Sequence, residues 1–176
     1  MCNNIIESGK MKIFVAIQFE DTFKSALKEA QEALKECGVR GNWCSDNNLH
    51  MTMVYIGETD EVELIQKAVD EVKFEPFEME LGKLGTFVTK YGRVIWCGVR
   101  EERPLNKIAK VLRERLDVHG IRYKGTKFKP HISLLKEANM EETDIEVERA
   151  SMIVEKMVVM KSEKINGAFV YSPIPK

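Results

Sequence analysis

One short pattern occurs twice in this chain, each time within an apolar run of residues that favours a β-strand. The first copy places His50 and Thr52 two residues apart, and the second places His131 and Ser133 at the same spacing. Side chains at alternate positions of a strand project from the same face, roughly 7 Å apart. Each copy therefore predicts a strand face that presents an imidazole and a hydroxyl together.

The two copies are separated by nearly half the chain, and the elements around them follow a similar order. The apolar spacing predicts a strand, a helix and then a histidine strand in each half. These elements are expected at 11–19, 21–38 and 49–57 in the first half, and at 93–99, 104–120 and 128–135 in the second. Further strands are expected at 42–45, 77–84, 151–160 and 167–171, with a further helix at 60–72.

Several of these strands follow one another through short turns, which favours antiparallel pairing and an α+β class. We therefore predict a bilobal fold in which two mostly antiparallel sheets are related by a pseudo-twofold axis. Helices are expected to flank the sheets, and the two histidine strands are expected to face a central groove.

The ends of the predicted helices carry recognisable signals. Gly38 and Gly120 suit the residue that follows a helix, since glycine readily adopts the left-handed conformation. Pro104 suits a first-turn position. Asp60 with Glu63 resembles a capping box at the start of the helix expected at 60–72.

Composition restricts the class of protein. A chain of 176 residues with 44% hydrophobic residues suits one domain, which we place at 11–176 after a polar, disordered leader at 1–10. A membrane span and an exported protein are not expected, since the sequence has no long apolar run and no apolar signal core near its start. Four scattered cysteines favour reduced thiols in the cytoplasm. A net charge of −1 argues against wrapping long nucleic acid and, with no obvious apolar stripe on the surface, favours a monomer.

Two histidines on opposite sides of one phosphate would form an acid–base pair, because imidazole titrates near neutral pH. A neutral imidazole would take a proton from water as the water attacks phosphorus, and an imidazolium would protonate the leaving ribose oxygen. Thr52 and Ser133 could donate hydrogen bonds to the non-bridging oxygens. A cyclic phosphate is a strained diester, so this arrangement could act on it without a metal ion.

Each part also has a simpler interpretation. A single His-x-Thr in a strand usually contains a structural histidine, and only the second copy favours a functional role. His119 precedes Gly120 at a helix end, where a cation would meet the helix dipole, and we interpret it as structural. Cys37, Cys44 and His50 do not match a compact zinc spacing, so no metal site is expected.

A basic run surrounds the second motif. Arg122, Lys124, Lys127, Lys129 and Lys136 occur with no acidic residue among them. Such runs are usually solvated surface, but this one lies next to a candidate catalytic histidine. Its position slightly favours a basic rim that attracts a phosphorylated end.

The chain resembles the two-histidine phosphoesterase superfamily and, within it, the RNA 2′,3′-cyclic phosphodiesterases, also called 2′-5′ RNA ligases. The resemblance covers about residues 11–173. It depends on the opening strand 12–17, the first motif at 48–53, the strand 93–99 and the second motif at 128–134. The paired motif is fairly specific to the superfamily and less specific for the substrate.

This resemblance implies hydrolysis of 2′,3′-cyclic phosphate ends of RNA or small cyclic nucleotides to 2′-phosphomonoesters, with no metal ion or cofactor. It implies that His50 is the proton donor to the leaving 3′ oxygen. It also implies that His131 is the proton acceptor that activates water, and that Thr52 and Ser133 bind the phosphate.

Two positions depart from the family pattern. Ser133 stands where threonine is more frequent, which keeps the hydroxyl. Lys136 stands where arginine is frequent, which replaces a bidentate fork with a point charge. Lys129 and Lys136 are both candidates for a substrate rim, although strict alternation places Lys136 on the face opposite His131.

Other activities stay open at this stage. The chain could act on 2′-5′ linkages or on ADP-ribose cyclic phosphate, as a phosphodiesterase or as a ligase. It could also be a nucleotide-binding module without turnover, although the presence of both histidines and both hydroxyls counts against this reading.

Overall fold

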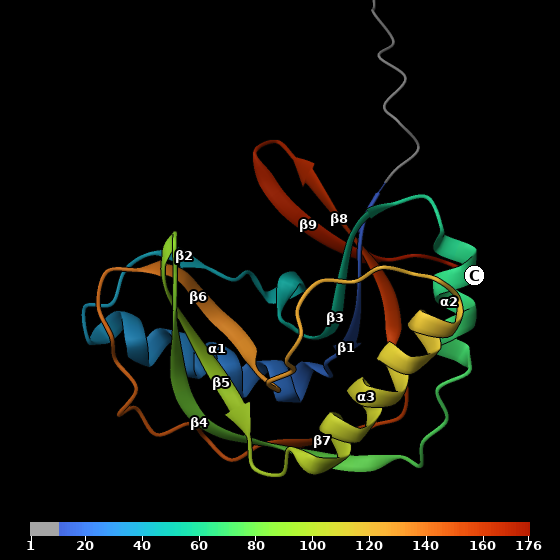
Figure 1. The fold of residues 1–176 in the computed structure, drawn as a ribbon. Helices are drawn as coiled ribbons and strands as arrows, with labels where there is room; N and C mark the ends of the chain where they lie inside the picture. The colour runs from blue at the N-terminus through green and yellow to red at the C-terminus, as the bar shows by residue number, and fades with distance from the viewer. Residues whose placement is uncertain (1–10) are drawn as a thin grey trace, which may run out of the picture.

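The computed structural model describes residues 11–176, which form two antiparallel sheets and three α-helices (Figure 1). In chain order the elements are β1 (Met11–Gln18), α1 (Asp21–Glu36), β2 (Asn42–Trp43), the 3₁₀ turn η1 (Asp46–Asn48), β3 (His50–Thr59), α2 (Val62–Asp70), β4 (Phe77–Thr89), β5 (Gly92–Val99), α3 (Arg103–Val118), β6 (Ile132–Ala138), β7 (Ser151–Val154), β8 (Val158–Ile165) and β9 (Ala168–Pro173). The leader expected at 1–10 lies outside the described residues.

The two sheets contain one histidine motif each. The first sheet has the strand order β3-β1-β8-β9, and the second has the order β2-β6-β5-β4-β7. Every pairing between these strands is antiparallel. In the first sheet the motif strand β3 pairs with β1, the strand that begins the first half of the chain. In the second sheet β6, which follows His131, pairs with β5, the strand that begins the second half. The predicted α+β, bilobal arrangement is confirmed.

The helices are exchanged between the two sheets. Helix α1 follows β1 but packs against β6 of the other sheet, and α3 follows β5 but packs against β3. Helix α2 packs against α3 and β8. The buried residues of α1 recur every three or four positions (Phe23, Ala26, Leu27, Ala30, Leu34), as expected for a helix with one apolar face. One continuous buried cluster therefore includes residues of both sheets and all three helices.

The helix ends agree with the sequence only in part. Gly38 and Gly120 have φ angles of 87° and 69°, and the residue after each glycine donates its N–H to a carbonyl of the preceding helix, so both predicted ends are confirmed. The capping box is wrong. Helix α2 has Glu61 at its N-cap without a side-chain cap, because the Thr59 hydroxyl accepts the N–H of Glu61 instead.

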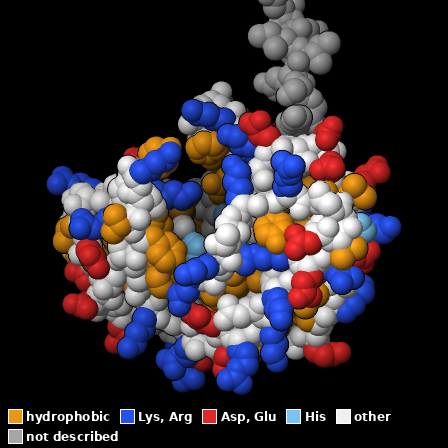
Figure 2. All heavy atoms as spheres, viewed as in Figure 1, with side chains coloured by type: hydrophobic (Ala, Val, Ile, Leu, Met, Phe, Trp, Pro, Cys, Tyr) orange, Lys and Arg blue, Asp and Glu red, His pale blue; other side chains and the backbone are white. Residues whose placement is uncertain are grey.

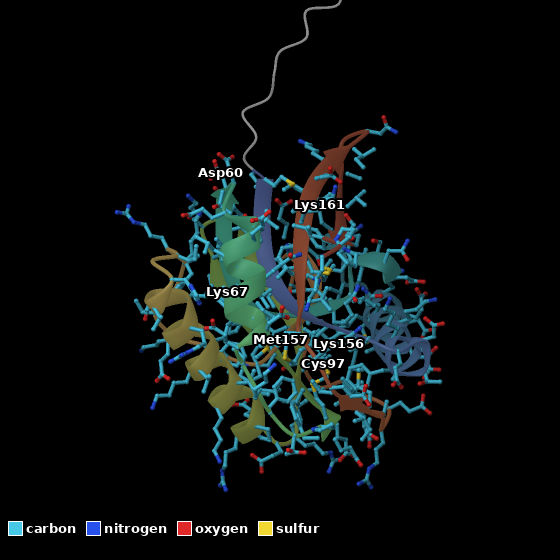
Figure 3. The ribbon with its side chains drawn as sticks, turned by 90° about the vertical axis from the view of Figure 1, so that its right-hand side faces the viewer. Asp60, Lys67, Cys97, Lys156, Met157 and Lys161 are labelled. Atoms are coloured by element: carbon cyan, nitrogen blue, oxygen red, sulfur yellow. The ribbon has the colours of Figure 1, made fainter. Side chains whose placement is uncertain are left out.

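The strand expected at 151–160 is also wrong, because the chain changes sheets within it. Strand β7 pairs with β4 in the five-stranded sheet, whereas β8 pairs with β1 in the four-stranded sheet. Lys156 and Met157 lie at this crossing (Figure 3). Glu155 and Lys156 are both exposed, whereas Met157 is 8% exposed, so the sequence marks the crossing only by two charged residues between apolar runs.

Strand β4 is longer than the expected strand at 77–84, since it continues to Thr89. This extension places the ring of Phe87 next to that of His131, with 4.9 Å between the ring centroids. Among residues 11–176, no helix has the length and apolar character needed to cross a membrane.

Candidate active site

A cavity of about 320 Å³ lies between the two sheets and contains both motifs. Figure 2 shows this side of the molecule as a hollow with histidine surface at its base and lysine or arginine side chains around its mouth. The cavity is lined by Lys12, Phe14, Cys44, Asn48, His50, Thr52, Tyr55, His131, Ser133, Lys136, Ser162, Phe169 and Tyr171. The predicted residues His50, Thr52, His131, Ser133 and Lys136 are therefore brought together, although they come from distant parts of the sequence.

Each motif strand contains a β-bulge at the third residue after its histidine. In β3 the partners of Val15 and Ala16 are Val54 and Thr52, which leaves Met53 as the extra residue. In β6 the partners of Ile95 and Trp96 are Leu135 and Ser133, which leaves Leu134 as the extra residue. A bulge shifts the alternation of side chains by one position.

The bulges bring the fifth residue after each histidine back to the groove. That residue is Tyr55 in β3 and Lys136 in β6, and both line the cavity. The face expected for Lys136 from strict alternation is therefore wrong, and the bulge at Leu134 is the physical reason. The pseudo-twofold relation thus extends to three equivalent positions in each motif strand.

A buried glutamine of α1 supports the second bulge. The side-chain nitrogen of Gln31 donates to the carbonyl of Leu134 at 3.0 Å and to the carbonyl of Cys44 at 2.9 Å. Gln31 is only 5% exposed, so these carbonyls have a partner where water has little access. The sequence carried a signal for this role, since a polar residue stands within the apolar face of α1 between Leu27 and Leu34.

The orientation of each imidazole is fixed by a main-chain carbonyl two residues earlier. Nδ1 of His50 lies 2.6 Å from the carbonyl oxygen of Asn48, and Nδ1 of His131 lies 2.6 Å from that of Lys129. Because a carbonyl can only accept a hydrogen bond, Nδ1 carries the proton in both rings. Nε2 is therefore the atom that gains and loses a proton, and in His50 it lies 2.8 Å from the hydroxyl oxygen of Thr52.

Burial lowers the pKa of both imidazoles. For His50 the positive charges of Lys136 and His131 act in the same direction, and the hydrogen bond to Asn48 opposes them. For His131 the charges of Lys129 and Lys136 lower the pKa further, and the hydrogen bond to the Lys129 carbonyl opposes them. Both rings therefore favour the neutral form near neutral pH, and an anion bound between them would raise the pKa of each.

Each imidazole also contacts two aromatic rings. The ring centroid of His50 lies 5.0 Å from that of Phe14 and 5.2 Å from that of Tyr171. The centroid of His131 lies 4.9 Å from that of Phe87 and 6.1 Å from that of Trp96. These neighbours restrict ring rotation, and sequence analysis did not predict them because they come from other strands.

The basic run of the second motif is divided by the fold. Lys136 lines the cavity, whereas the ammonium of Lys129 pairs with Glu102 and lies 5.7 Å from the ring centroid of Trp96. Lys124 lies over the ring of Tyr55 and donates its N–H to the Tyr55 carbonyl. Of the five basic residues in the run, Lys136 is the one that lines this cavity.

His119 and two of the cysteines lie apart from the two motifs in the sequence. His119 ends α3 and its Nε2 lies 3.0 Å from a carboxylate oxygen of Glu71. Burial raises the pKa of the Cys44 thiol at the cavity wall, and it raises that of Cys97 in the core to about 12. Within residues 11–176, no group of three or more histidine, cysteine or acidic side chains is placed to hold a metal ion.

Comparison with known proteins identifies the family of this chain. Residues 19–165 match the family model described as the 2′-5′ RNA ligase superfamily. A protein named RNA 2′,3′-cyclic phosphodiesterase from Archaeoglobus fulgidus is 33% identical over 77% of this chain and 78% of its own length. A protein of the same name from Thermotoga maritima is 32% identical over 70% of this chain and 68% of its own length.

Solved structures share the fold. The crystal structure of LigT from E. coli complexed with 3′-AMP is 21% identical and superposes with a TM-score of 0.78, covering 96% of each chain. The family match spans both histidine motifs and most of the described chain. The chain belongs to the 2′-5′ RNA ligase superfamily.

Proposed function

We propose that this protein hydrolyses 2′,3′-cyclic phosphate ends of RNA or nucleotides to 2′-phosphomonoesters, with His50 and His131 as acid and base and without a metal ion. The observation that carries the proposal is the meeting of two imidazoles and two hydroxyls in one cavity. The relatives named RNA 2′,3′-cyclic phosphodiesterase support the reaction type, and E. coli LigT has been crystallised with 3′-AMP and with phosphate.

In the proposed step, a water molecule attacks phosphorus and its proton passes to Nε2 of His131. The new phosphorus–oxygen bond forms as the bond from phosphorus to the 3′ oxygen breaks. Nε2 of His50 gives its proton to that oxygen, which leaves a 3′ hydroxyl and a 2′-phosphomonoester. Each proton transfer typically contributes about 10²–10⁴-fold in rate.

The remaining cavity residues act on the phosphate. The hydroxyls of Thr52 and Ser133 donate to non-bridging oxygens, where negative charge concentrates during the reaction. The ammonium of Lys136, brought to this face by its bulge, offsets the charge of the phosphate. Because the substrate is an anion, its arrival also raises the pKa of His50 and favours the protonated acid.

A turnover assay on 2′,3′-cyclic mononucleotides and on short RNA with a cyclic phosphate end tests the proposal. We expect hydrolysis in the presence of a strong chelator, and phosphorus NMR should place the phosphate of the product on the 2′ hydroxyl. His50→Ala and His131→Ala should each abolish turnover. His119→Ala, at the end of α3, is the matched control and should retain the wild-type rate. A wild-type rate in either cavity variant would reject the proposed roles.

The superfamily description favours a second candidate reaction, the formation or cleavage of 2′-5′ linkages. The same step with the 5′ hydroxyl of another RNA in place of water would join the two strands through a 2′-5′ linkage. Incubation of cyclic phosphate RNA with a 5′-hydroxyl RNA, followed by measurement of product length, distinguishes hydrolysis from joining. ADP-ribose cyclic phosphate belongs in the same substrate panel. Nucleotide binding without turnover of any substrate would instead favour a binding module.

A further inference from the structure

The β8–β9 hairpin forms one wall of the cavity and carries two aromatic residues toward it. The hairpin makes the outer edge of the four-stranded sheet and rises beside the groove (Figure 1). Phe169 and Tyr171 are two residues apart on β9, so they project from the same face, and both line the cavity. They lie on the side of the cavity that contains His50.

Phe169 is the most exposed of the aromatic residues that line the cavity. Phe14 is 3% exposed and Tyr55 is only partly exposed. Tyr171 packs edge-on against both His50 and Phe14. Phe169 is 52% exposed, and it belongs to neither apolar cluster of the described residues.

The backbone at Phe169 is nevertheless held firmly. The side-chain amide of Asn48 donates to the carbonyl of Phe169 at 2.8 Å, and the N–H of Tyr171 donates to the side-chain oxygen of Asn48 at 3.2 Å. The main-chain carbonyl of the same asparagine accepts Nδ1–H of His50. One residue therefore holds both the backbone of Phe169 and the imidazole of His50.

Cations accompany the aromatic ring at this end of the cavity. Lys164 is paired with Phe169 across the hairpin, and its ammonium lies 5.9 Å from the ring centroid. Lys12 and Ser162 are paired on neighbouring strands and both line the cavity. A flat apolar face beside cations is the arrangement on which proteins stack single-stranded bases while contacting the nucleic acid backbone.

We propose that Phe169 is the surface on which the base of the terminal nucleotide stacks, and that it accepts any of the four bases. The inference rests on the proposed function, since it assumes that the phosphate lies between His50 and His131. Stacking uses the π-face that every base has, so it supplies affinity without sequence preference.

Steady-state kinetics on two substrates test this inference. One is a 2′,3′-cyclic mononucleotide, and the other is 1-O-methylribose 2,3-cyclic phosphate, which has the reacting group but no base. For Phe169→Ala we expect KM for the nucleotide to rise about 5- to 150-fold with little change in kcat. The same variant should match the wild type on the substrate without a base, and Phe169→Trp should restore the nucleotide KM.

Tyr91→Ala is the matched control. Tyr91 is 71% exposed on the β4–β5 turn and also has a lysine over its ring, but it does not line the cavity. We expect its kinetics to equal those of the wild type on both substrates.

Other outcomes distinguish a failure of the stacking inference from a failure of the proposed function. An equal loss on both substrates would give Phe169 only a structural role, and an unchanged nucleotide KM would place the base elsewhere. If the wild type hydrolyses neither substrate, the proposed function fails, but calorimetric titration with adenosine 2′-monophosphate still tests stacking. Affinity should then fall by a similar factor in Phe169→Ala, and an equal affinity in both proteins would overturn the inference.

Discussion

Two main-chain carbonyls, those of Asn48 and Lys129, determine which nitrogen of each imidazole is available to a substrate. The sequence predicted the two histidines and the two hydroxyls, because residue type and spacing carry that information. It could not predict the carbonyls, since their direction depends on the backbone entering each motif. Nor could it predict the separation of Lys129 from Lys136, which depends on Glu102 and Trp96 of other elements.

The lowered pKa values make a prediction about pH. The base must be neutral, so kcat/KM rises as pH increases through the pKa of the base. The acid must be protonated, so kcat/KM falls as pH increases through the pKa of the acid. Both pKa values lie below the ordinary value of 6.5 in the free protein, so we expect a bell-shaped profile with its maximum below pH 6.5. A maximum clearly above that pH, measured in buffers of constant ionic strength, would contradict the assignment.

Lys136 offers a second prediction at the same scale. Its charge lowers the pKa of both histidines, so Lys136→Met should move both limbs of the pH profile to higher pH. Loss of a charged partner for the phosphate should also reduce kcat/KM about 10- to 100-fold. NMR titration of the imidazole protons measures the pKa values directly. Lys124→Met, which removes a lysine outside the cavity, should leave both pKa values unchanged.

At the scale of elements, the bulges determine which side chains of the motif strands face the cavity. The sequence does contain their trace, because Met53-Val54 and Leu134-Leu135 are each two consecutive buried residues that interrupt the alternation. Two consecutive apolar residues do not by themselves predict a bulge, since they also occur in strands that are covered on both faces. The crossing between β7 and β8 has a similarly weak trace, the two consecutive exposed residues Glu155 and Lys156, and apolar residues on both sides made one continuous strand the simpler prediction.

Gln31 makes the second bulge testable. Gln31→Leu keeps a side chain of similar size but removes the side-chain donor of the Cys44 carbonyl and one of the two donors of the Leu134 carbonyl, which also accepts the N–H of Cys44. We expect a loss of about 1–3 kcal/mol in the free energy of unfolding. Urea unfolding followed by circular dichroism measures it. Gln66→Leu is the control, because Gln66 also donates to two carbonyls, at Ile174 and Pro175, but near solvent. Equal losses in the two variants would contradict a special role for Gln31.

For the whole molecule, the exchange of helices joins the two sheets into one structure. The sequence predicted the strand, helix and histidine strand of each half, but helical periodicity does not say which sheet a helix covers. Helix α1 covers the second motif strand and α3 covers the first, so neither sheet retains its apolar cover if the other unfolds.

We therefore expect a single cooperative unfolding transition. Both tryptophans, Trp43 and Trp96, belong to strands of the five-stranded sheet, so their fluorescence reports on that sheet. Far-ultraviolet circular dichroism reports on the whole chain. The two signals should give coincident urea transitions, which is the test of two-state behaviour. Separate midpoints would mean that the lobes unfold independently, and would also count against a single domain at 11–176.

The helix exchange has one more consequence. If the chain were cut in the turn between β4 and β5, α1 would be separated from β6 and α3 from β3, so each piece would contain a helix without the strand that it covers. Only re-association would bury those helices, and the same event would bring the two imidazoles together, so stability and chemistry would return in a single step.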